Sequence, residues 1–235
     1  IKNNDLTLAD NIDYFNYIGE KYLLNIETLC TVMTRPDLFD IKNIPIKKNN
    51  QKVNGLRFAF YPYHKKELKE QVNIAKEKGY EIYLNPIGIS CYSIDEIKYI
   101  IDFLNKLRPK CISIVDSFGA LDFISLSKIQ KVFNSELDQN IVLGIHLHEN
   151  MGISLALACQ FINENKNNRD IIIDSSLQGI GRVPGNLCSE VIMSQLNFSE
   201  DKKYNLSPIL EVIDEVINPI RKKIAWGYMP HYYLS

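Results

Sequence analysis

Two of the chain's four histidines, His146 and His148, stand two residues apart in the stretch GIHLHENMG (144–152), at the end of an apolar run. If this run is a β-strand, residues i and i+2 point to the same side of it. Alternate Cα atoms are about 6.5–7 Å apart, so both rings could reach one ion. Neutral imidazole is the commonest transition-metal ligand in proteins. The pair therefore indicates a metal site or, alternatively, two hydrogen-bonded structural histidines.

A second stretch, IIIDSSLQGIGRVPGNLCSE (171–190), combines an apolar run, a glycine-containing loop and a helix that we expect to begin near Asn186. Glycine lets the backbone approach another group closely. The N–H groups of a helix N-terminus, together with the cation of Arg182, would suit an anionic ligand. The spacing does not match the dinucleotide-binding fingerprint, and an ordinary tight turn would also explain these glycines, which are Gly179, Gly181 and Gly185.

These residues must be positioned by the elements around them. Six continuously apolar runs are typical of strands that are covered on both faces. We expect strands at 25–34, 56–62, 80–88, 111–117, 141–148 and 171–177. Helical patterns are expected at 8–23, 66–79, 93–107, 125–137 and 153–165. Ser93 and Glu96 have the spacing of a capping box, and Gly79 suits a helix C-terminus. This alternation predicts βα units and a parallel sheet.

Two α/β architectures fit the alternation, an open doubly wound sheet and a TIM (β/α)8 barrel. Polar residues end successive runs, as at the active-site face of a barrel; they are Asn85, Asp116, His146 with His148, and Asp174. We therefore expect residues 1–200 to form a partial barrel domain with strands 3–8, its first two strands being missing from this chain. Residues 201–235 should form a helical segment that packs on the barrel or at a dimer interface.

The bulk properties exclude several classes of function. The 235 residues are 46% hydrophobic and 23% charged, and a net charge of −1 gives no field that favours nucleic acid or a membrane surface. No apolar run approaches the roughly 20 residues of a membrane span. The five cysteines include no CxxC pair, which favours reduced thiols and a cytoplasmic protein. A small-molecule substrate is the expected partner, and a homodimer through the aromatic C-terminus is one option.

Together, GIHLHENMGISLALA and DSSLQGIGRVPGNLCSE resemble the paired motifs of the DRE-TIM metallolyases, the HMG-CoA lyase-like superfamily. The likeness is strongest to the "aldolase catalytic domain" proteins related to 4-hydroxy-2-oxovalerate aldolase. Those proteins share a strand that ends in DS-G, seen here as VDSFGA (115–120), and a C-terminal WGY…YYLS, seen here at 226–235. The resemblance runs from about residue 25 to the end of the chain.

The resemblance implies a divalent metal ion, Mn²⁺ or Mg²⁺ in the first place and Zn²⁺ as a further option. His146 and His148 match the two metal-binding histidines of the family. Asn186 matches a position that ligates the metal in some members and only lies near it in others.

Three further residues receive roles from the same resemblance. Asp116 matches a strand-end acid that shapes the substrate site. Tyr232 matches an acid/base tyrosine, with interface packing as the alternative. Arg57, expected near a strand end, could meet a substrate carboxylate or a carboxylate of the scaffold.

The implied activity is an aldolase that cleaves or forms a C–C bond in a 4-hydroxy-2-oxo acid through pyruvate enolate chemistry. A Claisen-type synthase that joins acyl-CoA and a 2-oxo acid is the second reading. A catalytically inactive barrel that serves as a binding or accessory subunit is the third. The third stays open because the family's first-strand Asp and Arg, with a nearby His base, are not found in these 235 residues.

Overall fold

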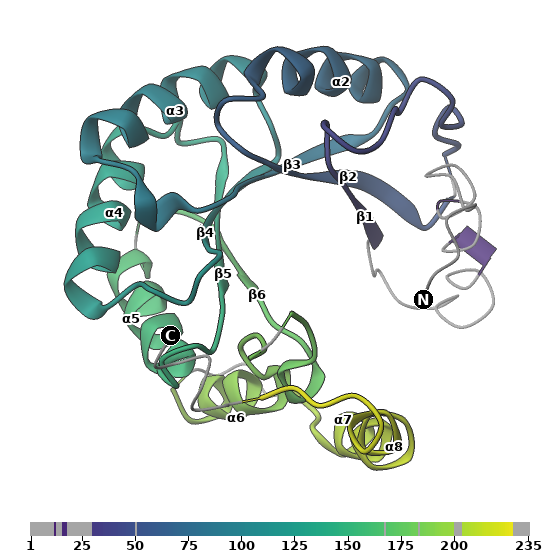
Figure 1. Ribbon diagram of the computed structural model, residues 1–235, viewed down its shortest axis with the longest axis vertical. Coiled ribbons are helices and arrows are strands. Elements are labelled where there is room, and N and C mark those ends of the chain that lie inside the picture. Colours follow the sequence, from purple (N-terminus) through teal and green to yellow (C-terminus); the bar gives the residue numbers. More distant parts are fainter. Residues whose placement is uncertain are drawn as a thin grey trace. The chain divides into compact units, whose positions relative to one another are not determined.

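Strands and helices alternate along the chain in the computed structural model, as Figure 1 shows. The structure describes residues 12, 16–17, 30–49, 51–166, 168–182, 184–199 and 204–227. Most of the predicted helix 8–23 lies outside these ranges, as do residues 25–29 of the first predicted strand. The described positions 12, 16 and 17 are helical.

Six parallel strands form one sheet in the order β1-β2-β3-β4-β5-β6. This order confirms the predicted α/β architecture of a partial (β/α) barrel, in which each strand neighbours the next one in sequence. The strands are β1 (Cys30–Thr34), β2 (Val53–Phe60), β3 (Glu81–Pro86), β4 (Cys111–Asp116), β5 (Val142–Leu147) and β6 (Ile171–Asp174).

The helices α2 (Lys65–Glu77), α3 (Ile94–Leu107), α4 (Phe123–Glu136) and α5 (Ser154–Asn165) lie close to their predicted ranges. They are followed by α6 (Ser189–Ser199), α7 (Ser207–Val212) and α8 (Asn218–Arg221). A π-helical stretch, η3 (Ile213–Ile217), joins α7 to α8, and the short 3-10 turns η1 (Ile89–Cys91) and η2 (Leu177–Gly179) follow β3 and β6. None of the helices in the described ranges is long and apolar enough to span a membrane.

The predicted capping box is present at the start of α3. The backbone N–H of Ser93 donates to the Glu96 carboxylate at 2.8 Å, and the backbone N–H of Glu96 donates to Ser93 Oγ at 3.3 Å. Two donors at this helix end are thereby satisfied, as the sequence spacing predicts. At the end of α2, Gly79 has a φ of +87°, which is the left-handed conformation that commonly terminates a helix.

The chain forms two compact units. The first comprises Ile1–Ile87, Tyr99–Ser113 and Leu137–Ile141, and the second comprises Gly88–Lys98, Ile114–Glu136 and Val142–Ser235. The unit boundary runs through α3 and through β4, so both elements contribute residues to each unit.

In the first unit, β2 buries alternate side chains against α2. Leu56, Phe58 and Phe60 of the strand have no exposed surface, and Leu68 and Val72 of the helix are equally buried. Burial of each such side chain stabilises the fold by about 1.5–3 kcal/mol. The period of two along β2 leaves Arg57 on the other side of the sheet.

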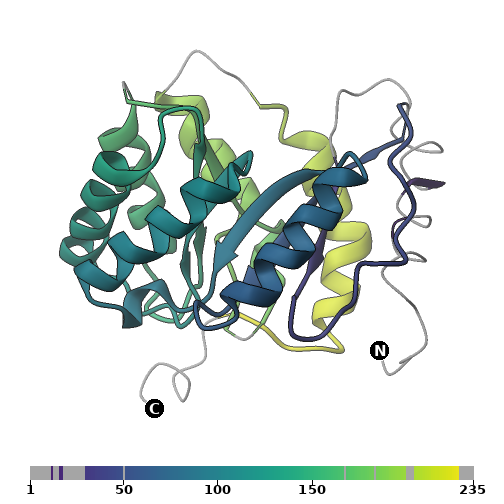
Figure 2. The same ribbon diagram turned by 90° about the horizontal axis from the view of Figure 1, so that it is seen from above.

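In the second unit, β5 is covered on one side by α5. Leu143, Ile145 and Leu147 are fully or almost fully buried, and α5 packs against β5. Helices α4 and α5 lie side by side in both views (Figures 1 and 2) and are joined by a 2.9 Å hydrogen bond from Asn134 Nδ2 to Asn165 Oδ1. Because the side chains of a strand alternate, His146 lies on the side of β5 that α5 does not cover.

The segment after α6 packs on the loop that follows β6. Ile213, Ile217 and Trp226 form a buried cluster. The partly buried residues that pack against it are Leu177, Ile180 and Ile209. The Trp226 indole N–H also donates to the carbonyl of Gln178 at 2.8 Å. The C-terminal helical segment therefore supports the glycine-containing loop, within the second unit.

Candidate functional site

His146 and His148 bring their imidazole rings together at the end of β5. The ring centroids are 5.3 Å apart and the ring planes meet at 64°. His146 is the penultimate residue of β5, and His148 follows the strand directly. Side-chain alternation on the strand thus places two nitrogen ligands on one side, within reach of a shared ion.

Asn186 is brought to the histidine pair by the backbone. His148 and Asn186 form an isolated antiparallel bridge, which places two residues with potential ligand atoms opposite each other. The Asn186 Nδ2 donates to the carbonyl of Ile180 at 3.1 Å, so the orientation of the amide is set. Its Oδ1 is buried and accepts no hydrogen bond from any residue that the structure describes. A buried acceptor without a partner is costly, and a cation would satisfy it.

The glycine-containing loop is shaped around Asn186. A Cβ atom at Gly181 would collide with the Asn186 amide nitrogen, and one at Gly179 would lie 2.5 Å from the Asn186 carbonyl oxygen. Only glycine fits these positions without displacing the amide. Close packing on Asn186 therefore explains Gly179 and Gly181, whereas a Cβ at Gly185 would instead lie 2.6 Å from the carbonyl oxygen of Gly179.

The helix after this loop begins at Ser189, not near Asn186 as the sequence predicts. The reason is that Asn186 bridges His148 and Cys188 bridges Ser176, so the intervening backbone is engaged in β-type pairing. The start of α6 is consequently three residues after the predicted position, and an anion site at this helix N-terminus stays a prediction.

His148 is held in its neutral form. Burial, followed by the neighbouring His146 and the charge of Arg182, lowers the pKa of His148 to about 4. An imidazole must be unprotonated to bind a metal ion. His148 is therefore ready to act as a ligand at neutral pH.

Asp174 lies beside the histidine pair. It ends β6, it is paired with His146 in the parallel register, and its Oδ2 lies 3.2 Å from His146 Nδ1. Sequence reasoning places Asp174 at a strand end but gives it no role. The signal that could have found it is its position, one βα unit after His146, on the neighbouring parallel strand.

Asp116 holds the loop after β4. Its side chain is 1% exposed, and its two oxygens accept the backbone N–H groups of Ala120 at 2.9 Å and Leu121 at 3.2 Å. Burial raises the pKa of Asp116, while these two hydrogen bonds oppose the shift. The loop includes Gly119, where a Cβ would collide with Asn150. Asp116 thus holds the loop that packs against Asn150. A direct contact between Asp116 and a substrate stays a prediction.

The roles of the two other predicted site residues, Arg57 and Tyr232, stay predictions. Arg57 belongs to the first unit and lies within β2, three residues before its end, so the expected strand-end position is wrong. It is paired with Tyr83 in the register, and its guanidinium carbon lies 6.0 Å from the centroid of that ring. Tyr232 lies outside the described residues.

The residues present fit a divalent metal ion. His146 and His148 offer imidazole nitrogens, and Asn186 offers an orphaned amide oxygen. Within the described ranges, no group of three or more His, Cys, Asp and Glu side chains is placed to share an ion. The candidate set is therefore two nitrogens and one neutral oxygen, and imidazole suits Zn²⁺ and other transition metals better than it suits Mg²⁺.

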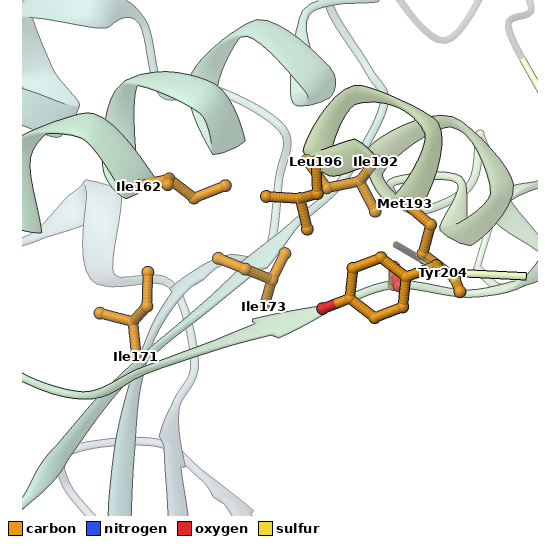
Figure 3. Close-up of a pocket in the computed structure, with 8 residues that line it drawn as sticks. Ile162, Ile171, Ile173, Ile192, Met193, Leu196 and Tyr204 are labelled. Atoms are coloured by element: carbon orange, nitrogen blue, oxygen red, sulfur yellow. The ribbon is translucent and has the colours of Figure 1, made fainter. Parts of the chain in front are cut away.

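A cavity of about 360 Å³ lies elsewhere, between β6 and the helices α5 and α6 (Figure 3). Ile171 and Ile173 of β6 face this cavity, so Asp174, at the next position, points to the other side of the strand. None of the described residues that line it is charged; they are Ile162, Ile171, Ile173, Ser175, Ile192, Met193, Leu196 and Tyr204. These described residues therefore offer the cavity neither the usual metal ligands nor a strong acid or base.

Parallel strands alternating with helices define a (β/α) barrel-type protein, and the candidate site lies at the carboxyl ends of its strands, where such folds carry their sites. A family model described as HMGL-like matches residues 61–216, and the chain belongs to this family. The resemblance to the DRE-TIM metallolyases is thereby confirmed.

Individual relatives are distant. A 4-hydroxy-2-oxovalerate aldolase from Geobacillus genomosp. 3 is 23% identical over 153 residues, which are 65% of this chain and 44% of that protein. A 2-isopropylmalate synthase from Streptococcus gallolyticus (strain UCN34) is 24% identical over 153 residues, 64% of this chain and 28% of that protein. The chain thus spans less than half the length of either relative.

Among solved structures, the fold is similar to the N-terminal domain of a protein assigned as an aldolase from Bacteroides vulgatus. The TM-score is 0.73 at 21% identity, and the match covers 91% of this chain and 70% of that one. At this identity the likeness establishes the shared fold.

Proposed function

We propose that the chain belongs to a divalent-metal-dependent aldolase that cleaves or forms a C–C bond in a 4-hydroxy-2-oxo acid. The observation that carries the proposal is the convergence of His146, His148 and the orphaned Asn186 oxygen in a chain of the HMGL-like family. The relatives named 4-hydroxy-2-oxovalerate aldolase support the choice of substrate class.

In this proposal His146, His148 and Asn186 hold the ion; the family resemblance puts Mn²⁺ or Mg²⁺ first, whereas the two imidazole ligands favour Zn²⁺ over Mg²⁺. When bound, the ion supplies Lewis acidity toward negative charge that develops on the oxygens of the 2-oxo acid. The chain's own contribution is to keep His148 unprotonated and to hold the Asn186 amide through its bond to Ile180.

Arg182 places a positive charge near the histidine pair. Arg182 is exposed on the glycine-containing loop, acts electrostatically on His148, and forms no ion pair with the residues that the structure describes. We propose that it attracts the substrate carboxylate, and that Tyr232 moves a proton on the alcohol or enolate oxygen. Replacing Arg182 with Gln should raise KM more than it lowers kcat, because the side chain would act in binding.

A Claisen-type synthase is the second candidate, favoured by the 2-isopropylmalate synthase relative. The two reactions differ in the co-substrate, since only the synthase consumes an acyl-CoA. Loss of the acyl-CoA thioester in the presence of a 2-oxo acid would identify the synthase, and pyruvate release from a 4-hydroxy-2-oxo acid would identify the aldolase.

The deciding experiment measures pyruvate release from a panel of 4-hydroxy-2-oxo acids, with Mn²⁺, Mg²⁺ or Zn²⁺ added, for the unaltered protein and for His146→Ala with His148→Ala. The double variant should lose both metal binding and activity. His64→Ala is the matched control, because His64 lies in the first unit and caps α2 without a side-chain hydrogen bond. Full metal occupancy in the double variant would contradict the site, and metal binding without either activity would favour the accessory-subunit reading.

A further inference from the structure

Asp174 contacts His146 of the candidate metal site but is not one of its three candidate ligands. We propose that Asp174 is a positioning residue, which accepts a hydrogen bond from the Nδ1–H of His146 and so directs the Nε2 lone pair of that ring toward a divalent ion. The inference rests on the metal site of the proposed function and assigns a role to a residue outside its ligand set.

The contact is set by the sheet itself. His146 and Asp174 are direct partners in the parallel pairing of β5 with β6, and the Oδ2–Nδ1 distance is 3.2 Å. The side chains are only 22% and 12% exposed, so water competes weakly for the hydrogen bond. Because both residues sit on strands rather than on a loop, the ring is oriented before any ion arrives.

The chemistry of the two groups selects one tautomer. An ionised carboxylate can only accept hydrogen bonds, so the His146 nitrogen that faces Asp174 must carry the hydrogen. A neutral imidazole with its hydrogen on Nδ1 has its free lone pair on Nε2. A carboxylate on the second nitrogen of a metal-binding histidine also raises the basicity of the ligand.

Asp174 acts through His146 and not as a third ligand. The described side chains contain no set of three His, Cys, Asp and Glu placed to share one ion, so Asp174 does not complete a site with the two histidines. It approaches the Nδ1 edge of His146, and the opposite edge of the ring remains for the ion. His148 differs, because its ring makes no hydrogen bond to a described residue and its neutrality comes mainly from burial.

The test compares Asp174→Asn and Asp174→Leu with the unaltered chain, and uses Asp170→Asn as the matched control. Asp170 immediately precedes β6, is exposed, and contributes only its backbone carbonyl to Leu143. Mn²⁺ binding is measured by calorimetry. Loss of such a supporting hydrogen bond typically weakens metal affinity about 10–100-fold, so Asp174→Leu should fall in this range and Asp174→Asn should lose less. Asp170→Asn should bind like the unaltered chain.

A second readout needs no metal. Nitrogen NMR of the metal-free chain, with His146 assigned by comparison with His146→Gln, should show the Nδ1–H tautomer in the unaltered protein and the loss of this preference in Asp174→Leu. Circular dichroism checks that each variant is folded, and Asp174→Ala, which also removes the acceptor but adds no larger side chain, replaces Asp174→Leu if that variant does not fold.

The outcomes separate the two proposals. Unchanged Mn²⁺ affinity and an unchanged His146 tautomer in folded Asp174 variants would overturn the positioning role and leave the proposed function intact. Absence of Mn²⁺ binding in the unaltered chain would overturn the metal site, and the positioning role with it.

Discussion

His148 and Asn186 face each other across an isolated antiparallel bridge, although they lie in the segments that follow two different strands. The bridge brings an imidazole and an amide together through backbone pairing, so their proximity does not depend on long, mobile side chains. The bond from Asn186 Nδ2 to Ile180 then leaves Oδ1 as the atom offered to a ligand.

Asn186→Ala should weaken Mn²⁺ binding at least about tenfold, since it removes the oxygen and the hydrogen bond that orients it. The measurement is a calorimetric titration with Mn²⁺. Asn163→Ala, an exposed position on α5, serves as the control and should leave the affinity unchanged. Equal affinities for both variants would remove Asn186 from the ligand set.

Gly181→Ala should displace the Asn186 amide, because the added Cβ would collide with its nitrogen. We expect reduced Mn²⁺ affinity and a loss of unfolding free energy of about 1–3 kcal/mol from overpacking. Gly152→Ala provides a contrasting variant: its φ of +69° disfavours alanine by about 1–2 kcal/mol, yet no atom lies within 4 Å of the added Cβ. Gly152→Ala should therefore lose stability but keep its Mn²⁺ affinity.

The metal-free chain should lose stability through His148 as the pH falls from 6.5 toward 4. The unfolded chain, with the ordinary pKa of 6.5, binds a proton in this window that the folded chain, with a pKa of about 4, does not bind. The free energy of unfolding therefore decreases as the pH falls, and this contribution levels off below the folded-state pKa. Urea unfolding across the window should show a smaller pH slope for His148→Gln than for the unaltered chain, with His64→Gln as the control. Identical slopes would argue against the depressed pKa.

Asp116→Asn should lower the free energy of unfolding by about 1–3 kcal/mol, because an amide has only one acceptor oxygen for the two N–H groups of Ala120 and Leu121. Chemical denaturation measures the loss, and the exposed Asp170→Asn should be close to neutral. If Asp116→Asn proved as stable as the unaltered chain, the carboxylate would not be what holds the loop.

The order of strands and helices could be predicted from the sequence because each element carries its own local signal. The apolar runs of the strands are continuous, and Ser93 and Glu96 mark a helix start whose hydrogen bonds the structure confirms. The position of α6 could not be predicted, because Asn186 and Cys188 are held by partners far away in the sequence. Local pattern identifies elements, whereas pairing between distant segments decides where this helix begins.

The candidate site divides in the same way. His146 and His148 are neighbours on one strand, so their proximity follows from alternation alone. Asp174 and Asn186 approach them through β5–β6 pairing and a loop bridge, which require the folded chain. Arg57 is misplaced by a purely local error. The predicted strand begins at residue 56, which puts Arg57 next to a strand end, whereas β2 begins at Val53 and Arg57 lies within it.

The boundary between the two compact units crosses α3 and β4, and each unit is assembled from three separate stretches of chain. No single cut can release the half that carries His146 and Asn186 as an intact module. A protease that cleaves within β4 would accordingly cut an element that belongs to both units. The unit that holds the histidine pair therefore cannot be isolated as one continuous fragment.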